Sequence, residues 1–357
     1  VGRGESVETT LPEDDLWALR PELDEAFVDY LEYQRESKSF RAEDPFVTFY
    51  FDFLRFLNGL VASQSGAFSQ IAERRGRSSV VRILCKDPSP FLGATLARVH
   101  SAIALSATLS PSEFYRDLLG FDPERTAALS VPNPFPAANR RVVVDARVAT
   151  SWRKRPENYP VIAERLSSFA ESVPGNCLAL FPSYDFLRSV AELLEPKSKR
   201  ILIQDRADSD RERQAILEAL RGAVLRDILL LAVAGGVFAE GVDYPGDTLK
   251  AVAVIGPCLP GVSLDRELLK QYYQERFERG FEYAFVVPGM TRVVQAAGRL
   301  IRSAQDTGVI ALFGERFLVN PYRRNLPREW LPEEGATALA SEPAASAEAF
   351  FSTLLSP

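Results

Sequence analysis

The sequence predicts an α/β protein built around a doubly wound parallel sheet, with a helical segment before it. Between about residues 156 and 320, apolar strand-like runs alternate with helix-like runs. Such alternation is typical of a parallel sheet covered by helices on both faces. Residues 12–75 hold long aromatic-rich runs, which favour helices. The length of 357 residues is too great for one ordinary core, so more than one domain is expected.

The first predicted part is a helical segment over residues 1–78. Residues 1–75 carry 15 acidic and 8 basic side chains, whereas the other 282 residues carry 33 and 34. The net charge of −6 therefore arises in this segment, and the rest of the chain is nearly neutral. Phosphate binding by the rest of the chain must then depend on local placement of basic residues rather than on a global basic field.

The second predicted part covers residues 79–139. "SVVRILC" and "SAIALSATL" are β-rich runs, and "PFLGATLARV" between them predicts a short helix. The proline-rich stretch 131–142 is interpreted as a linker or a surface excursion.

The third predicted part, residues 140–332, carries the sheet, and residues 333–357 form a mobile tail that can hold one docking helix. The predicted strands are 177–181, 200–205, 227–233, 249–256 and 308–314. The predicted helices are 157–173, 184–195, 208–222, 264–279 and 289–303.

Several classes of protein find little support. The longest apolar run, residues 228–239, is too short to span a bilayer, and the first residues do not form a secretory signal. Cys85, Cys177 and Cys258 lie in separate apolar stretches, as expected of buried free thiols in a reducing compartment. His100 is the only histidine, so a histidine-based metal site or a Ser-His-Asp triad has no basis. We expect a cytoplasmic or nuclear protein without a membrane partner.

Candidate functional residues follow the predicted strands, because open α/β sheets place their sites at the carboxyl ends of strands. "PSYDFL", "DRADSD", "GGVFAEGVDYPG" and "PCLPGVSLDRELLKQYY" each follow one strand. Before the last strand, "QAAGRLIR" places Gln295, Arg299 and Arg302 at offsets of four and three, which predicts one shared helix face. Each signal is weak alone, since a glycine pair is often only a turn and such a helix face is often only solvated.

As a series, these stretches resemble the late motifs of superfamily 2 helicases, in particular the XPD/DinG family. "SATLSPSEFY" is similar to motif III, "LALFPSYDFL" to motif IV, "GGVFAEGVDYPG" to motif V and "QAAGRLIR" to motif VI. The resemblance covers roughly residues 80–330. It implies that residues 140–332 are the second RecA-like motor domain, and that residues 79–139 are a returning piece of the first motor domain. Residues 1–78 would then be part of the Arch domain.

The resemblance also implies roles. Arg302 would be the arginine finger and Arg299 a phosphate or interdomain contact, although the two assignments could be exchanged. Ser106 and Thr108 would couple the two motor domains. The implied nucleotide-binding residues are Gln295, Gly298, Gly241, Asp243 and Glu240. The implied DNA-binding residues are Ser183, Tyr184, Gly235, Gly236, Arg266 and Lys270. Alternatives stay open: Tyr184 could pack in the core, and Arg266 and Lys270 could pair with Asp265 and Glu267.

Other features of the family are absent from this sequence. No GxxxxGK[ST] motif occurs, and there is no Gly-Lys dipeptide, so this chain alone is not expected to hydrolyse ATP. "LDEAF" (23–27) superficially resembles the family's acidic box but follows no apolar strand. ATP and Mg²⁺ would serve the full-length protein. Three scattered cysteines cannot hold an iron–sulfur cluster, so any cluster would lie upstream, and no metal is expected in this chain.

The expected partners are single-stranded or forked DNA and a first motor domain that this chain lacks, with the protein acting as a monomer. The family implies 5′→3′ movement on a single strand. Two alternatives remain. "GGVFAEG" could belong to a nucleotide-sugar glycosyltransferase, and a lone second motor domain could act as a non-catalytic nucleic-acid-binding module.

Overall fold

The computed structural model describes residues 6–38, 43–222, 226–331 and 342–355. The chain forms two compact units. The first consists of Val1–Ala102, Asp117–Pro123 and Val262–Gly280, and the second of Ile103–Arg116, Glu124–Gly261 and Phe281–Pro357. Residues 262–280 thus group with the N-terminal part of the chain, although they lie inside the predicted domain 140–332.

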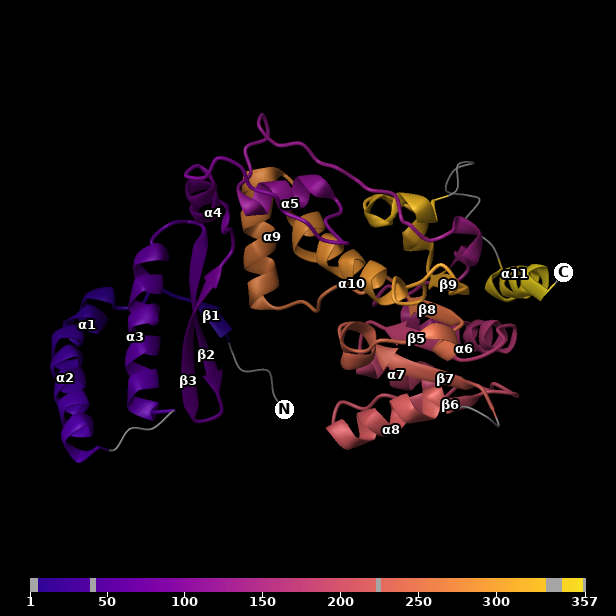
Figure 1. Ribbon diagram of the computed structural model, residues 1–357, viewed down its shortest axis with the longest axis horizontal. Coiled ribbons are helices and arrows are strands. Elements are labelled where there is room, and N and C mark those ends of the chain that lie inside the picture. Colours follow the sequence, from indigo (N-terminus) through magenta and orange to yellow (C-terminus); the bar gives the residue numbers. More distant parts are fainter. Residues whose placement is uncertain (1–5, 39–42, 223–225, 332–341, 356–357) are drawn as a thin grey trace. The chain divides into compact units, whose positions relative to one another are not determined.

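A six-stranded parallel sheet forms the centre of the second unit (Figure 1). The strand order is β4-β9-β8-β5-β7-β6. Five strands coincide with predicted runs, and the sixth, β4, pairs with β9 at one edge. The sequence analysis missed β4 because its short "VVV" run adjoins the proline-rich stretch. The strands are β4 (Arg140–Asp145), β5 (Cys177–Phe181), β6 (Arg200–Ile203), β7 (Ile228–Val233), β8 (Ala251–Ile255) and β9 (Gly308–Phe313).

Helices cover both faces of this sheet, which confirms the predicted α/β class. Successive side chains of a strand point to opposite faces. Leu178 and Leu180 of β5 therefore join one core with α8 and α10, while Ala179 and Phe181 join the other core with α6, α7 and α11. The helices are α6 (Arg155–Glu171), α7 (Tyr184–Ala191), α8 (Asp210–Arg221), α10 (Val287–Ala297) and α11 (Pro343–Leu355).

The C-terminal helix α11 is part of this fold. Its Ala347 and Phe351 are buried in the core with α6, and Glu342 just before it forms an ion pair with Arg165, 2.9 Å between Oε1 and Nη2. The predicted tail 333–357 therefore contains a docked helix, and its residues 333–341 and 356–357 lie outside the described part of the chain.

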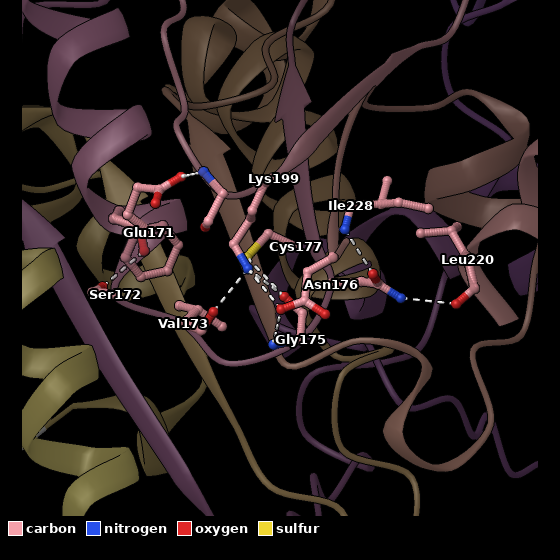
Figure 2. A network of polar contacts seen from close by, with 12 residues as sticks. Glu171, Ser172, Val173, Gly175, Asn176, Cys177, Lys199, Leu220 and Ile228 are labelled. Atoms are coloured by element: carbon pink, nitrogen blue, oxygen red, sulfur yellow. Dashed lines mark hydrogen bonds and ion pairs between the residues drawn. The ribbon is translucent and has the colours of Figure 1, made fainter. Parts of the chain in front are cut away.

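A buried lysine joins several segments at the amino-terminal edge of the sheet (Figure 2). Only 1% of the Lys199 side chain is exposed. Its Nζ donates to the carbonyl oxygens of Val173, at 2.8 Å, and Gly175, at 2.6 Å, and lies 3.5 Å from Asp227 Oδ2. This lysine therefore holds the turn after α6 next to the start of β6.

Asn176 performs a similar task beside it (Figure 2). Its side-chain amide donates to the carbonyl oxygens of Leu220, at 2.8 Å, and Thr248, at 3.0 Å. Its side-chain oxygen accepts the N–H of Ile228 at 2.8 Å. One buried amide thus fixes the end of α8 and the starts of β7 and β8, because a buried polar group is stable only when its hydrogen bonds are satisfied.

The first unit combines helices with a small antiparallel sheet of order β1-β2-β3. Gly76, with φ +62°, and Arg77 form the two-residue turn between β2 and β3, a position that favours glycine. Asp44 begins α3 by accepting the N–H groups of Phe46 and Val47. The elements are β1 (Ser6–Glu8), α1 (Glu13–Ala18), α2 (Arg20–Ser37), α3 (Pro45–Ala62), β2 (Phe68–Arg75), β3 (Ser78–Cys85), α4 (Ser89–Leu96) and α9 (Leu264–Phe277).

Helix α9 belongs to this unit through specific side-chain bonds. Asp265 accepts two hydrogen bonds from Arg82 of β3, at 2.6 and 2.7 Å. The hydroxyl of Tyr272 donates to Asp87 Oδ2 at 2.9 Å, and Arg276 Nε lies 2.8 Å from the same oxygen. Because Asp87 is completely buried, these bonds neutralise a carboxylate that would otherwise be costly to bury.

Three expectations for this region were wrong. Residues 68–75 form strand β2 rather than helix, because pairing with β3 outweighs local preference. The run 101–109 contains no strand; Ile103 and Leu105 are 87% and 85% exposed. Cys85 is exposed, whereas Cys177 and Cys258 are buried as predicted. The chain next forms α5 (Ser112–Leu119) before it reaches β4.

Candidate functional site

The candidate site lies at the carboxyl-terminal edge of the six-stranded sheet. Backbone hydrogen bonds align the strand ends there: Ala234 N donates to Phe181 O at 2.9 Å, and Gly256 N donates to Phe313 O at 2.8 Å. The loops that follow β5, β6, β7 and β8 consequently begin at one edge, as expected for a parallel sheet.

Two predicted arginines contact the segment that follows β7 and contains two predicted acids. The guanidinium of Arg299 donates to the backbone carbonyls of Glu240 and Val242. Arg302 Nη1 lies 2.6 Å from Asp243 Oδ1, and Arg299 Nη1 lies 3.6 Å from the same oxygen. The stretches that resemble motifs V and VI are therefore in direct contact through one carboxylate and two guanidinium groups.

The arginines do not lie on a helix face, and this part of the prediction was wrong. Helix α10 ends at Ala297, and Gly298 caps it. Asp306 then accepts the backbone N–H groups of Arg302 and Ser303, each at 2.8 Å. This carboxylate stabilises a turn where the sequence pattern predicted continued helix, because it replaces the helical acceptors of those N–H groups.

The two arginines differ in exposure. The Arg299 side chain is 17% exposed and its Nε has no hydrogen-bond partner, whereas the Arg302 side chain is 42% exposed and faces an Asp243 side chain that is 70% exposed. Burial raises the pKa of the nearby Tyr244, and the charge of Arg299 opposes that shift. Arg299 is thus built into the loop, and Arg302 is accessible.

Backbone conformation explains the first glycine of the turn after β7, and packing explains the second. Gly235 has φ +86°, which disfavours other residues, and a Cβ there would lie 3.6 Å from Arg292 Nε and from Glu240 Oε1. A Cβ on Gly236 would lie only 2.9 Å from Val233 O. The chain then forms a π-helix over Val237–Gly241, which contains Glu240 and Gly241. A Cβ on Gly241 would lie 3.1 Å from Cγ2 of Val237, so glycine leaves room for that side chain.

Arg292 is a residue that the sequence analysis missed. It lies on α10, three positions before Gln295, and its guanidinium adjoins Gly235. Its charge also opposes the burial that raises the pKa of Cys258 to about 12. The helical spacing of Arg292 and Gln295 was the available signal for this residue.

The predicted coupling residues are bonded to α10. Gln295 Nε2 donates to Thr108 Oγ1 at 3.3 Å, and the Thr108 N–H donates to Ser106 Oγ at 3.2 Å. The stretch that resembles motif III is therefore bonded to α10.

Ser183 and Tyr184 lie at the start of α7, directly after β5. Ser183 Oγ accepts the N–H of Phe186 at 3.3 Å and so caps the helix. The ring of Tyr184 is only partly buried and faces the guanidinium of Arg206, whose carbon lies 5.2 Å from the ring centroid. Tyr184 thus packs against the core without being fully buried, and Arg206, in the loop after β6, is a further basic residue that the sequence analysis did not name.

Arg266 and Lys270 lie on α9, in the other compact unit. Lys270 Nζ forms an ion pair with Glu267 at 3.0 Å, and Asp265 pairs with Arg82. Of the pairings that the sequence left open as alternatives, Lys270 does pair with Glu267, whereas Asp265 pairs with Arg82 instead.

Metal binding has no preformed site in the part of the chain that the structure describes. No group of three or more His, Cys, Asp or Glu side chains is arranged to hold an ion there. The cysteines cannot form a cluster site, because Cys85 belongs to one unit while Cys177 and Cys258 lie at opposite ends of strands in the other. Within the described ranges, no helix is both long and apolar enough to cross a bilayer.

Comparisons with known proteins agree on one kind of domain. Residues 166–334 match the family described as "Helicase C-terminal domain". The chain is 27% identical over 299 residues to the XPD helicase subunit of general transcription and DNA repair factor IIH from Schizosaccharomyces pombe, covering 78% of this chain and 38% of that protein. It is 29% identical over 252 residues to the ATP-dependent DNA helicase YoaA of Escherichia coli, covering 69% and 36%.

Solved structures give the same fold. A structure titled "XPD_Helicase" superposes with a TM-score of 0.56 at 19% identity, covering 90% of this chain and 56% of that one. A second, titled "XPD_APO", gives 0.54 at 20% identity, with 90% and 63% covered. The chain thus spans less than two fifths of the two curated relatives.

Proposed function

We propose that the chain is a member of the XPD/DinG family of superfamily 2 DNA helicases, which it resembles in sequence and fold, and that it supplies the second motor domain of an ATP-dependent enzyme that unwinds DNA. The observation that carries the proposal is the contact of Arg299 and Arg302 with the loop Glu240–Asp243. Residues 166–334 include this contact and the Gly-Gly turn, so a helicase accounts for that turn without a sugar nucleotide.

In this proposal Arg302 is the group that reaches the transferred phosphoryl. A guanidinium is always charged and presents a planar fork of donors to phosphate oxygens. Arg302 is accessible and held only by Asp243, an exposed pair of the kind that contributes about 0–1 kcal/mol. Phosphate oxygens can therefore displace Asp243 at small cost. Arg299, bonded to two backbone carbonyls, instead keeps the loop in place for this exchange.

The same contact would couple nucleotide binding to DNA binding. When the guanidinium of Arg302 moves from Asp243 to a phosphate, the loop Glu240–Asp243 loses one of its contacts with the segment after α10. This loop follows the Gly235–Gly236 turn, which we propose contacts the DNA backbone together with Ser183 and Tyr184. Arg266 and Lys270 would add contacts from the other unit. Movement would follow a single strand, in the 5′→3′ direction that the family implies.

The proposal also includes a first motor domain as the partner of this chain. Ile103 and Leu105 alternate with smaller residues and are exposed, as expected of a strand that lacks its sheet. We propose that this run completes a first motor domain, which would bring the phosphate loop and the Mg²⁺-binding acids. ATP would then be held between the two motor domains. The protein would act as a monomer on single-stranded or forked DNA, in the cytoplasm or the nucleus.

The chain by itself is expected to bind single-stranded DNA but not to hydrolyse ATP, because no Gly-Lys dipeptide occurs in its 357 residues. The measurement is phosphate release with and without single-stranded DNA, beside DNA binding at several salt concentrations. DNA-stimulated turnover that co-purifies with the chain would contradict the assignment of the phosphate loop to another part.

The arginine assignment is tested with Arg302→Ala in the intact enzyme. We expect turnover to fall by about 10³-fold or more, with DNA affinity and unfolding temperature nearly unchanged, since a finger acts mainly in the transition state. Arg302→Lys should restore little because an ammonium lacks the fork.

Arg213→Ala is the matched control. Arg213 is 37% exposed and pairs with Asp210 at 2.9 Å on the surface of α8, so it resembles Arg302 in exposure and partner but lies on another element. It should keep wild-type turnover. Wild-type turnover in Arg302→Ala would refute the finger, and equal loss of turnover and DNA binding would indicate a folding defect.

A further inference from the structure

Trp152 is exposed to an unusual degree for so large an aromatic side chain. It is 77% exposed, in the turn between β4 and α6, whereas Trp330 is 5% exposed. Burial of an indole is strongly favourable, so a tryptophan left in water suggests a surface that meets a ligand. Trp152 lies outside the matched residues 166–334 and outside the predicted site.

We propose that Trp152 is a stacking platform for a base of single-stranded nucleic acid. The inference rests on the proposed function for the presence of DNA, but it assigns the contact to a residue and a surface of its own.

One face of the indole is already occupied. The guanidinium carbon of Arg155 lies 4.1 Å from the centroid of the Trp152 ring and 5.0 Å from that of Phe186, which is completely buried. Arg155 thus lies between a surface ring and a core ring, and it fixes the tryptophan against the domain. Since most of Trp152 is still exposed, its other face is available for a base.

The turn that carries Trp152 is held in place by hydrogen bonds. Ser151 O accepts the N–H groups of Lys154, at 3.0 Å, and Arg155, at 2.8 Å. Asn158 of α6 accepts the N–H of Ala149 at 3.0 Å and donates to Lys154 O at 2.9 Å. The platform is therefore ordered before any ligand arrives, which lowers the entropic cost of binding.

The turn also lies on the functional edge of the sheet. The preceding residue Thr150 is buried and packs where Gly256 and Gly314 follow β8 and β9; a Cβ on Gly256 would lie 2.5 Å from Thr150 Oγ1. Phe186, which contacts Arg155, lies in the first turn of α7 beside Ser183 and Tyr184. Trp152 is therefore on the same edge as the predicted DNA contacts.

Charge at this surface favours a nucleic acid over an apolar protein partner. Arg153 and Lys154 are exposed beside Trp152, and in the described part of the chain neither side chain has an ion pair or hydrogen bond. Tyr184 with Arg206 repeats the combination of a ring and a guanidinium. Basic groups that follow a backbone and rings that receive bases are the features by which single strands are bound without sequence preference.

The test uses the whole chain, a labelled dT oligonucleotide and a matched oligomer with the same backbone but no bases, with binding followed by fluorescence anisotropy. Trp152→Ala should weaken dT binding by about 5- to 100-fold, the range for loss of one stacked base. Binding of the abasic oligomer should change little. Trp152→Phe should retain part of the affinity, and Trp152→Leu, apolar but without a π-face, should not.

Two further variants separate stacking from charge. Lys154→Gln should reduce affinity for both oligomers and lower the slope of log K against log salt by about 0.7, one phosphate contact on a single strand. Trp152→Ala should leave that slope unchanged. Leu129→Ala, at an 88% exposed position of the same unit, controls for loss of a surface apolar group.

The outcomes are distinct. If the unaltered chain binds dT and Trp152→Ala binds it equally well, the stacking platform is refuted while the proposed function stands. Equal loss on dT and on the abasic oligomer would also refute stacking. If the unaltered chain binds neither oligomer, both the platform and the DNA-binding part of the proposed function fail.

Discussion

Arg299 and Arg302 show how two identical side chains three positions apart can take different tasks. Arg299 is mostly buried, and its guanidinium is bound to backbone carbonyls of the loop after β7. Among the described residues, the guanidinium of Arg302 pairs with one carboxylate, that of Asp243, which is itself exposed. Sequence spacing does not separate the two arginines, and the difference in burial supports our proposal that Arg302 acts on phosphate, because only an accessible guanidinium can exchange partners.

The three thiols should differ in reactivity for a similar reason. Burial raises the pKa of Cys177 and of Cys258 to about 12, so both stay protonated at pH 8, and the thiolate is the reactive form. Cys85 is exposed, although partial desolvation also raises its pKa. We expect iodoacetamide at pH 8 to modify Cys85 alone in the native chain and all three thiols in denaturant, as measured by mass spectrometry.

The Cys85→Ser variant is the control for that measurement. It should take up no label until it unfolds. Rapid native labelling of Cys177 or Cys258 would contradict the burial of those residues.

At the scale of the elements, the ends of helices and strands were set by single polar side chains. Asp306 replaces helical acceptors after α10, Ser183 caps α7, and Lys199 and Asn176 join the segments at the amino-terminal edge of the sheet (Figure 2). Each of these groups bonds to backbone atoms of a neighbouring segment. The boundaries of an element therefore depend on residues that its own periodicity does not reveal.

Replacement of Lys199 tests this view. Lys199→Met keeps the apolar stem but removes the donor to Val173 O and Gly175 O. Each buried carbonyl left without a partner costs about 1–3 kcal/mol, partly offset because no ammonium group is then desolvated. We expect the free energy of unfolding, measured with urea, to fall by about 1–3 kcal/mol.

Lys197→Met is the matched control for Lys199→Met. Lys197 lies two residues away and is exposed, so its replacement should change the unfolding free energy by no more than about 0.5 kcal/mol. Equal effects of the two substitutions would show that the buried network contributes nothing specific.

At the scale of the whole molecule, the two compact units are not consecutive in the chain. Helix α9 lies between stretches of the second unit in the sequence. Its side chains nevertheless bond to β3 and to Asp87 in the first unit. Its Leu268 and Tyr273 are buried, and the Tyr273 hydroxyl donates to Lys86 O at 2.9 Å. The integrity of α9 should therefore depend on a segment more than 180 residues earlier in the sequence.

Limited proteolysis measures that dependence. In the whole chain we expect trypsin to cleave slowly within residues 262–280, because α9 is packed. In a chain that begins at residue 124, the same segment loses its partners, and cleavage at its basic residues should be fast while the sheet of the second unit resists. Equal protection in both chains would show that α9 is held by the second unit instead.

The sequence by itself determined the parallel sheet, five of its six strands and the resemblance to a helicase family. These depend on apolar periodicity and on the order of short motifs, which are local properties of the chain. It also named the acids and arginines that meet after β7 and α10, although it placed both arginines on a helix that ends before them.

Only the tertiary structure decided the rest. Strands β2 and β4 exist because β3 and β9 pair with them, and Ile103 and Leu105 form no strand because no partner strand is present in the described residues. The different environments of Arg299 and Arg302, and the exposed ring of Trp152 on Arg155, follow from burial and from contacts between segments far apart in the chain. Pairing and burial join residues far apart in the chain, and no local pattern records them.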